Sequence, residues 1–198
     1  MMLVDKLKNH KIFLCSISPR RSELLRGMDI EFEVLPTHMK EDHPEGMSPL
    51  EVAEFLSKHK LSPIQYDDYP SNSIFIACDT IVVLNEQIIE KPKSEEEALQ
   101  MLQLLSGHEH IVISGLTVAN KHKSFTSSRT STVKFKTFTD EELQYYVSKY
   151  KPLDKAGAYG IQEWIGYIGI EYIQGSFYNV MGLPTKLLWE MLEKITQD

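Results

Sequence analysis

The fold is decided near the start of the chain, in the stretch Ile12-Phe-Leu-Cys-Ser-Ile-Ser-Pro-Arg-Arg-Ser-Glu-Leu-Leu25. Its first four residues are all apolar and predict a buried strand. Ser18 is suited to the N-cap of a helix, and Pro19 is suited to the first helical position. Leu24 and Leu25 then begin an apolar helical face. The stretch therefore predicts a strand that passes directly into a helix.

The start of this helix also indicates an anion ligand. A strand-to-helix junction directs free backbone N–H groups and the positive end of a helix dipole into one space. Arg20 and Arg21 add two cations to the first turn, where a cation alone is electrostatically unfavourable. We therefore expect a bound anion, above all a phosphate. A solvated basic turn is the alternative that this stretch alone leaves open.

Strand and helix signals alternate along the rest of the chain, which favours an α/β fold over a helical bundle or a β-sandwich. Residues 74–78 predict a central strand that ends at Asp79, and a hairpin follows around Asn85 and Glu86. The glycine-rich region 155–182 is expected to be mostly loop and short strand. N-cap signals for further helices lie at Ser48, Ser94 and Thr139.

The composition is that of an ordinary globular protein. The chain has 198 residues, of which 42% are hydrophobic and 25% are charged, and it suits a single domain spanning residues 1–198. Because no apolar run is long enough for a membrane span and no signal peptide is recognised, we expect a cytoplasmic protein without a membrane partner. The formal net charge of −7 argues against a nucleic-acid-binding surface. Cys15 and Cys78 are expected to be buried and reduced.

Asp79 is the strongest candidate for a catalytic residue. It follows an apolar strand, and open α/β sheets bind ligands at strand ends. Its carboxylate is suited to hold a divalent cation or to accept a proton from an attacking water. The alternative is an aspartate that only caps a turn. Glu41, in an acidic loop, is the candidate for a second metal ligand, with a solvated loop carboxylate as its alternative.

Two further segments carry cations beside residues that are suited to contact a ligand. Lys91 precedes a proline directly after the predicted hairpin. Lys155 and Gln162 flank a run of small residues, which lets backbone approach a ligand closely. The Gln162 amide can both donate to and accept from the edge of a base. Glycines that serve only turns are the alternative for this run.

Together these motifs resemble the Maf family of nucleotide pyrophosphatases. The matching segments follow the family order from about residue 11 to residue 190: Ser16-x-Ser-Pro-Arg-Arg-x-Glu-Leu-Leu, Cys78-Asp-Thr, Lys91-Pro, Leu105-Ser-Gly, Asp154-Lys-Ala-Gly-Ala-Tyr-Gly-Ile-Gln and Tyr178-Asn-Val-Met-Gly-Leu-Pro. The resemblance implies a mixed, twisted α/β sheet flanked by helices with a central cleft, related to the inosine-triphosphate pyrophosphatases, and a homodimer. It also implies hydrolysis of a nucleoside triphosphate to the monophosphate and pyrophosphate with Mg²⁺ or Mn²⁺.

The resemblance also implies roles for individual residues. Asp79 matches the proton acceptor, Glu41 and Lys91 match further active-site positions, and we expect Asp79 and Glu41 to hold the metal. Phosphate-contacting positions carry Ser16, Arg20, Arg21, Lys60 and Lys155. Positions associated with substrate choice carry Arg20, Thr80 and Gln162, and this set resembles the branch that acts on dTTP and UTP. The chain departs from the family pattern at Cys78, usually alanine, and at Glu90, usually glycine.

Two other functions stay open at this point. One is a non-catalytic, nucleotide-binding regulator of cell division or septum formation. The other is a pyrophosphatase for modified purine nucleotides or methylated GTP. Asp79, Glu41 and Lys91 favour an enzyme, because a protein that only binds a nucleotide has no need for a general base.

Overall fold

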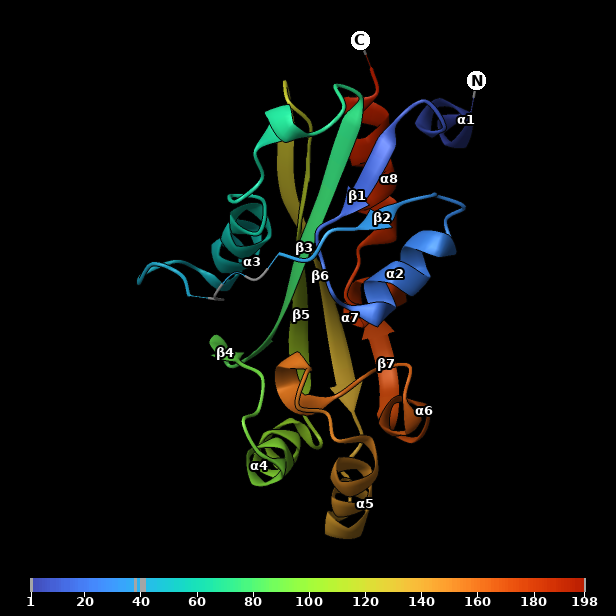
Figure 1. Ribbon diagram of the computed structural model, residues 1–198. Coiled ribbons are helices and arrows are strands. Elements are labelled where there is room, and N and C mark those ends of the chain that lie inside the picture. The colour runs from blue at the N-terminus through green and yellow to red at the C-terminus, as the bar shows by residue number, and fades with distance from the viewer. Residues whose placement is uncertain (1, 38, 40–41, 198) are drawn as a thin grey trace. The chain divides into compact units, whose positions relative to one another are not determined.

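The computed structural model describes residues 2–37, 39 and 42–197. Within these residues the chain forms a seven-stranded mixed sheet in the order β2-β1-β3-β5-β6-β7, with β4 paired to β3 (Figure 1). The strands are β1 (Lys11–Leu14), β2 (Glu33–Val34), β3 (Ser73–Leu84), β4 (Gln87–Ile89), β5 (Glu109–Ala119), β6 (Ser124–Phe135) and β7 (Ile170–Gln174). The predicted mixed α/β architecture is confirmed.

The described residues also form helices, and several begin where the sequence signals lie. They are α1 (Leu3–Leu7), α2 (Pro19–Arg26), α3 (Pro49–His59), α4 (Glu95–Leu105), α5 (Asp140–Tyr150), α6 (Trp164–Gly169), α7 (Phe177–Met181) and α8 (Thr185–Ile195), with 3₁₀ turns η1 (Tyr66–Asp68) and η2 (Ala156–Ala158). Ser48 and Thr139 each close a complete capping box at the start of α3 and α5. No helix in the described part of the chain is long and apolar enough to cross a membrane.

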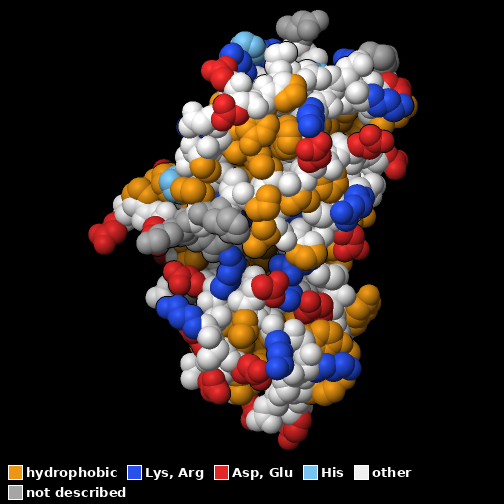
Figure 2. All heavy atoms as spheres, in the orientation of Figure 1, with side chains coloured by type: hydrophobic (Ala, Val, Ile, Leu, Met, Phe, Trp, Pro, Cys, Tyr) orange, Lys and Arg blue, Asp and Glu red, His pale blue; other side chains and the backbone are white. Residues whose placement is uncertain are grey.

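The chain forms two compact units. The first comprises Met1–Asp79, Ser114–Arg129 and Gly182–Asp198, and the second comprises Thr80–Ile113 and Thr130–Met181. Three of the four boundaries between them fall inside β3, β5 and β6, and the fourth directly follows α7. The extent of a single domain over residues 1–198 stays a prediction. Basic and acidic side chains are intermixed over the face seen in Figure 2.

The core of the first unit is built on parallel strands. β1 pairs in parallel with β2 and with β3, where Phe13 lies opposite Phe75 and Leu14 opposite Ile76. The Phe13 and Phe75 rings stack with their centroids 5.2 Å apart, and each meets the Tyr69 ring edge-on. Each buried side chain of this size contributes about 1.5–3 kcal/mol to stability. The stretch that predicts the first strand therefore forms a buried core strand.

The two cysteines lie in the same buried environment, as the sequence predicts. Cys15 and Cys78 are both fully buried, and both are free thiols. Burial raises the pKa of the Cys15 thiol to about 12, because the charged thiolate is disfavoured away from water. Cys15 is therefore an unreactive packing residue.

The predicted end of the central strand at Asp79 is wrong, because β3 runs without interruption from Ser73 to Leu84. Its second half pairs antiparallel with β4, through a hairpin in which Asn85 and Glu86 adopt positive φ angles of 49° and 65°. The predicted hairpin is thus confirmed, and its pairing extends the strand. The parallel ladder with β1 ends at the Leu14–Ile76 pair, so Asp79 still lies beyond the parallel part of β3.

Residues 155–182 are mostly loop and short strand, as expected, but two short helices also lie there. This region contains α6 and α7 as well as β7. Some of its glycines serve close packing: a Cβ at Gly169 would lie 2.0 Å from the Phe138 ring, and one at Gly166 would lie 1.8 Å from the Ile161 carbonyl oxygen. Glycine here allows a helix to pack directly on backbone and aromatic neighbours, which local helix propensity does not report.

Candidate active site

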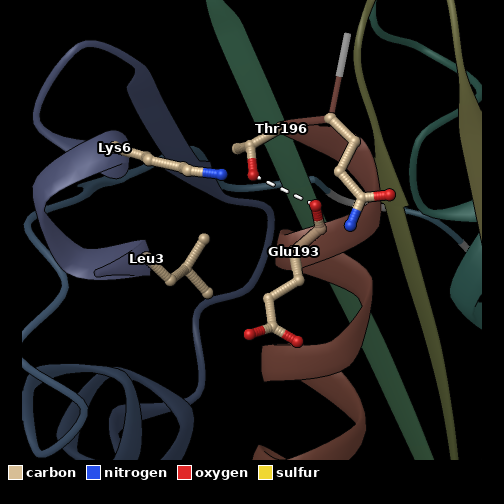
Figure 3. A pocket seen from close by; sticks show the side chains of 5 residues that line it. Leu3, Lys6, Glu193 and Thr196 are labelled. Atoms are coloured by element: carbon tan, nitrogen blue, oxygen red, sulfur yellow. Dashed lines mark hydrogen bonds between the residues drawn. The ribbon is translucent and has the colours of Figure 1, made fainter. Parts of the chain in front are cut away.

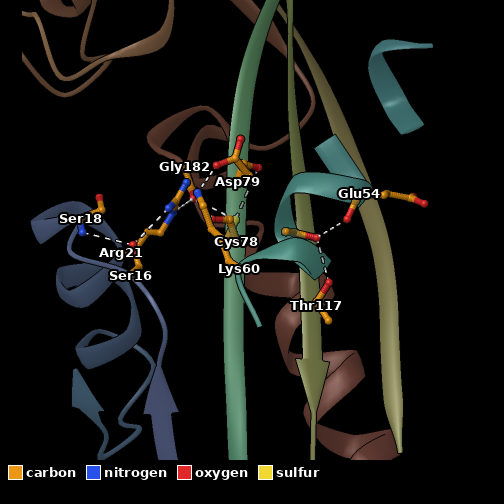
Figure 4. A network of polar contacts seen from close by, with 10 residues as sticks. Ser16, Ser18, Arg21, Glu54, Lys60, Cys78, Asp79, Thr117 and Gly182 are labelled. Atoms are coloured by element: carbon orange, nitrogen blue, oxygen red, sulfur yellow. Dashed lines mark hydrogen bonds and ion pairs between the residues drawn. The ribbon is translucent and has the colours of Figure 1, made fainter. Parts of the chain in front are cut away.

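The strand-to-helix junction of the first unit forms the expected turn. The Ser18 N–H donates to Ser16 Oγ at 3.2 Å, and α2 then begins at Pro19. Arg21 Nη1 donates to the same Ser16 Oγ at 3.2 Å, and Arg21 Nε donates to the Gly182 carbonyl at 2.9 Å (Figure 4). Two of the predicted phosphate-contacting residues, Ser16 and Arg21, are therefore in direct contact. Arg20 lies half-buried beside them in the first turn of α2.

Gly182 connects this junction to the strand that carries the candidate catalytic residue. Its carbonyl oxygen accepts the Arg21 bond and also lies 3.3 Å from the Cys78 thiol, which donates to it. Cys78 directly precedes Asp79 in β3. The cysteine that departs from the family pattern therefore takes part in a hydrogen-bonded contact between β3 and the segment before α8.

Asp79 is buried, and its carboxylate forms an ion pair with Lys60. The side chain of Asp79 is 6% exposed and that of Lys60 is 14% exposed. Lys60 Nζ contacts Asp79 Oδ1 and also donates to the Cys78 carbonyl at 3.3 Å (Figure 4). Removing one partner of such a pair leaves a buried charge uncompensated, which costs about 3–5 kcal/mol. Two predicted site residues, 19 positions apart in the chain, are thus in contact.

The position of Lys60 depends on how α3 lies against β5. Lys60 is the C-cap residue of α3. Ser57, one turn earlier, forms a buried hydroxyl pair with Thr117 of β5 at 2.9 Å. A Cβ at Gly115 of β5 would lie 1.9 Å from the Ala53 carbonyl oxygen, so the helix backbone contacts the strand at a glycine. A glycine in the interior of a strand is the sequence signal that indicates such a close approach.

The second unit carries the remaining predicted residues that the structure describes. Lys155 is buried, and its Nζ lies 2.7 Å from Asp154 Oδ1 and 3.2 Å from Glu163 Oε1. Gly157 adopts a φ of +67°, and its N–H donates to the Glu90 carbonyl at 3.2 Å. The segment that begins at Lys155 therefore lies beside the residue that precedes Lys91. Lys91 itself is exposed.

Gln162 carries an unusual buried polar atom. Its Oε1 is buried and has no hydrogen-bond partner within the described residues. Buried acceptors in proteins are almost always paired, so an orphaned one indicates a donor supplied by a ligand or a water. Thr80, the other predicted base-reading residue of this unit, is half-buried in β3 and directly follows Asp79.

Glu41 lies outside the described residues, so its role as a catalytic residue and metal ligand stays a prediction. Among the described residues, no group of three or more histidine, cysteine, aspartate or glutamate side chains is arranged to hold a metal ion.

A pocket outside this set of residues lies between α1 and the end of α8. It is lined by Leu3, Lys6, Glu193, Thr196 and Gln197 (Figure 3). The Thr196 hydroxyl donates to the backbone carbonyls of Leu192 and Glu193. None of the predicted catalytic or substrate-binding residues lines this pocket, and we assign it no part in the site.

Comparison with known proteins gives consistent matches over nearly the full chain. The sequence model of a family described as Maf-like protein matches residues 11–195. A protein of Porphyromonas gingivalis (strain ATCC 33277) is 44% identical over 194 residues, which cover 96% of this chain and 97% of that protein. A protein of Parabacteroides distasonis is 45% identical over 195 residues, which cover 96% of this chain and 99% of that protein. Both relatives are named dTTP/UTP pyrophosphatase.

Proposed function

Because this chain belongs to the Maf-like protein family, we propose that it hydrolyses dTTP and UTP to the nucleoside monophosphate and pyrophosphate. Relatives of that name match it along nearly their whole length at 44–45% identity. The structural observation that carries the proposal is the buried Asp79 carboxylate. It is paired with Lys60 and directly follows Cys78, whose thiol shares the Gly182 carbonyl with Arg21. A general base beside a set of cations suits attack by water on a phosphate.

The cations of the first unit are proposed to bind the polyphosphate. A nucleoside triphosphate carries about four negative charges, so its hydrolysis depends mainly on positioning and on charge neutralisation. Arg21 supports this role because its contacts with Ser16 and Gly182 fix the plane of its guanidinium. Arg20, Lys60 and, from the second unit, Lys91 and Lys155 are proposed to add further positive charge toward the phosphates.

Asp79 is proposed to accept a proton from the water that attacks the α-phosphorus. In the free protein its negative charge is balanced by Lys60. On substrate binding, we propose that the Lys60 ammonium turns toward a phosphate oxygen, which leaves the carboxylate available for the water. The pair therefore keeps a buried charge compensated until the substrate supplies its own charges.

Asp79 also suits a divalent cation. Mg²⁺ at phosphate sites is held by one or two carboxylates together with substrate phosphates and waters, and Asp79 with Glu41 is such a donor set. The Lys60 ammonium already contacts the Asp79 carboxylate, so the position beside this carboxylate favours a positive charge. A bound Mg²⁺ or Mn²⁺ would neutralise phosphate charge and lower the pKa of a coordinated water.

Base selection is proposed to rest on Gln162 and Thr80. Uracil and thymine both present an N3–H donor between two carbonyl oxygens. The orphaned Oε1 of Gln162 is an acceptor for that N–H, and the amide nitrogen is a donor for a neighbouring carbonyl. Cytosine has no proton on N3, so a Gln162 oxygen held opposite that atom finds no donor there, and cytosine is disfavoured.

We propose that the enzyme works as a cytoplasmic homodimer. The second unit exposes aromatic side chains on consecutive elements, with Tyr167 exposed by 83% and Tyr172, Phe177 and Tyr178 by 41–51%. β7, which carries Tyr172, stands at the end of the strand order, and edge strands are frequent sites of association between chains. The formal net charge of −7 does not favour nucleic acid as a partner.

A substrate panel tests the proposed function. The protein is incubated with Mg²⁺ and, separately, with dTTP, UTP, CTP, GTP or 7-methyl-GTP, and both products are measured. We expect dTTP and UTP to give the monophosphate and pyrophosphate, and a chelator to abolish both reactions. Nucleotide binding without turnover would support the non-catalytic regulator instead. Fastest turnover of 7-methyl-GTP or of a purine would support the other pyrophosphatase branch.

A further inference from the structure

A single tyrosine hydroxyl connects α5 to the segment that carries Lys155 and Gln162. Tyr146 of α5 is fully buried, and its ring stacks on Tyr150 with the centroids 5.0 Å apart. Its hydroxyl accepts a hydrogen bond from the Gly160 N–H at 3.0 Å and donates one to Glu163 Oε2. Burial and the bond to the Glu163 carboxylate raise the pKa of Tyr146, so the phenol stays a neutral donor.

Glu163 extends this connection to the buried lysine. One carboxylate oxygen of Glu163 accepts from Tyr146, and the other lies 3.2 Å from Lys155 Nζ. The side chain of Glu163 is 20% exposed and that of Lys155 only 9% exposed. The Lys155 ammonium is therefore held between Glu163 and Asp154, and the orientation of Glu163 is set by Tyr146.

Two glycines allow the backbone directly before Gln162 to be held closely. A Cβ at Gly160 would lie 2.7 Å from the Glu163 carboxylate carbon, so that carboxylate covers the Gly160 backbone. A Cβ at Gly166 would lie 1.8 Å from the Ile161 carbonyl oxygen, so α6 packs directly on the residue before Gln162. The backbone directly before Gln162 is thus fixed, and with it the region from which the unpaired Oε1 projects.

We propose that Tyr146 and Glu163 are positioning residues that hold the 155–163 segment in the conformation that reads the pyrimidine base. This inference deepens the proposed function and rests on it. Neither side chain needs to contact the nucleotide. Tyr146 and Glu163 affect base recognition indirectly, by keeping the segment around Gln162 rigid. A site that must place one amide against one base edge needs such a rigid, fully hydrogen-bonded support.

The test is base discrimination in the Tyr146→Phe variant, which keeps the ring and removes only the hydroxyl. The affinities of the full-length protein for UMP and CMP are measured by calorimetry, and kcat and KM are measured for UTP and CTP. We expect the preference for UMP over CMP to fall at least about tenfold, through weaker UMP binding. KM for UTP should rise by more than kcat falls. Circular dichroism checks that the variant is folded.

Tyr150→Phe is the matched control, because it removes a hydroxyl from the neighbouring tyrosine of the same helix. It should leave the UMP-to-CMP preference at the wild-type value. Glu163→Gln is the second variant: it keeps an acceptor for Tyr146 but removes the charge that faces Lys155. We expect it to lower discrimination as well, and it serves as the test if Tyr146→Phe does not fold.

The outcomes separate this inference from the proposed function. Wild-type turnover of UTP decides the proposed function, whereas the monophosphate affinities decide the role of Tyr146 and Glu163. A variant that is less heat-stable but keeps the wild-type UMP-to-CMP preference would show a purely structural role and overturn the inference. A wild-type protein that binds UMP and CMP equally would overturn it too.

Discussion

At the scale of single residues, the contact between Lys60 and Asp79 carries most of the chemical interpretation. The sequence predicts both residues as parts of the site, Asp79 from its place after an apolar strand and Lys60 through resemblance, but it does not predict that they form an ion pair. That pair depends on the end of α3 reaching the middle of β3, which is a property of packing. Both side chains are largely buried, so solvent screens their attraction far less than it would at the surface.

Removing Lys60 alone should be more damaging than removing both charges. Lys60→Met leaves Asp79 buried without its cation, and we expect the free energy of unfolding to fall by about 3–5 kcal/mol. The double variant Lys60→Met with Asp79→Asn should be more stable than Lys60→Met. Urea denaturation of the wild type, the two single variants and the double variant measures the coupling. Strictly additive effects would show that the pair contributes nothing.

At the scale of elements, local signals predict helix starts and turns well. The capping boxes at Ser48 and Thr139 and the hairpin at Asn85 and Glu86 are confirmed, because each depends only on neighbours in the chain. The end of the central strand at Asp79 was predicted wrongly, because pairing with β4 decides where β3 ends. The contact between Tyr146 and Gly160 spans 14 positions and has no local signal.

Gly115 should be needed for the position of α3. An alanine there would place its Cβ 1.9 Å from the Ala53 carbonyl oxygen, so the helix must move away from β5. We expect Gly115→Ala to lose about 1–3 kcal/mol of stability and, because α3 carries Lys60, to raise KM for UTP. Thermal unfolding and steady-state kinetics measure the two effects.

Gly27→Ala is the control for this substitution. Its Cβ would lie 3.4 Å from the nearest atom, in ordinary contact, and Gly27 has a right-handed helical backbone. We therefore expect Gly27→Ala to change the stability and the KM for UTP little. If Gly115→Ala changes stability and KM as little as Gly27→Ala does, then the position of α3 does not depend on its close approach to β5 at Gly115.

At the scale of the whole molecule, the sequence predicts the fold class and the family, and the family match over residues 11–195 confirms both. The site is predicted less completely. Composition and charge favour or disfavour only broad classes of function, whereas the chemistry depends on single contacts, such as the orphaned Gln162 oxygen and the carbonyl shared by Arg21 and Cys78. Contacts of this kind arise from the packed fold, so no sequence pattern specifies them.

The most direct test of the account is the turnover of UTP by the Asp79→Asn variant. The amide cannot accept the proton of the attacking water, so kcat should fall by at least about 10²-fold. Loading with Mn²⁺ and binding of UMP, both measured separately, show that the variant remains folded and able to bind. Turnover within a few fold of the wild type, with the metal bound, would contradict the assignment of Asp79 as the general base.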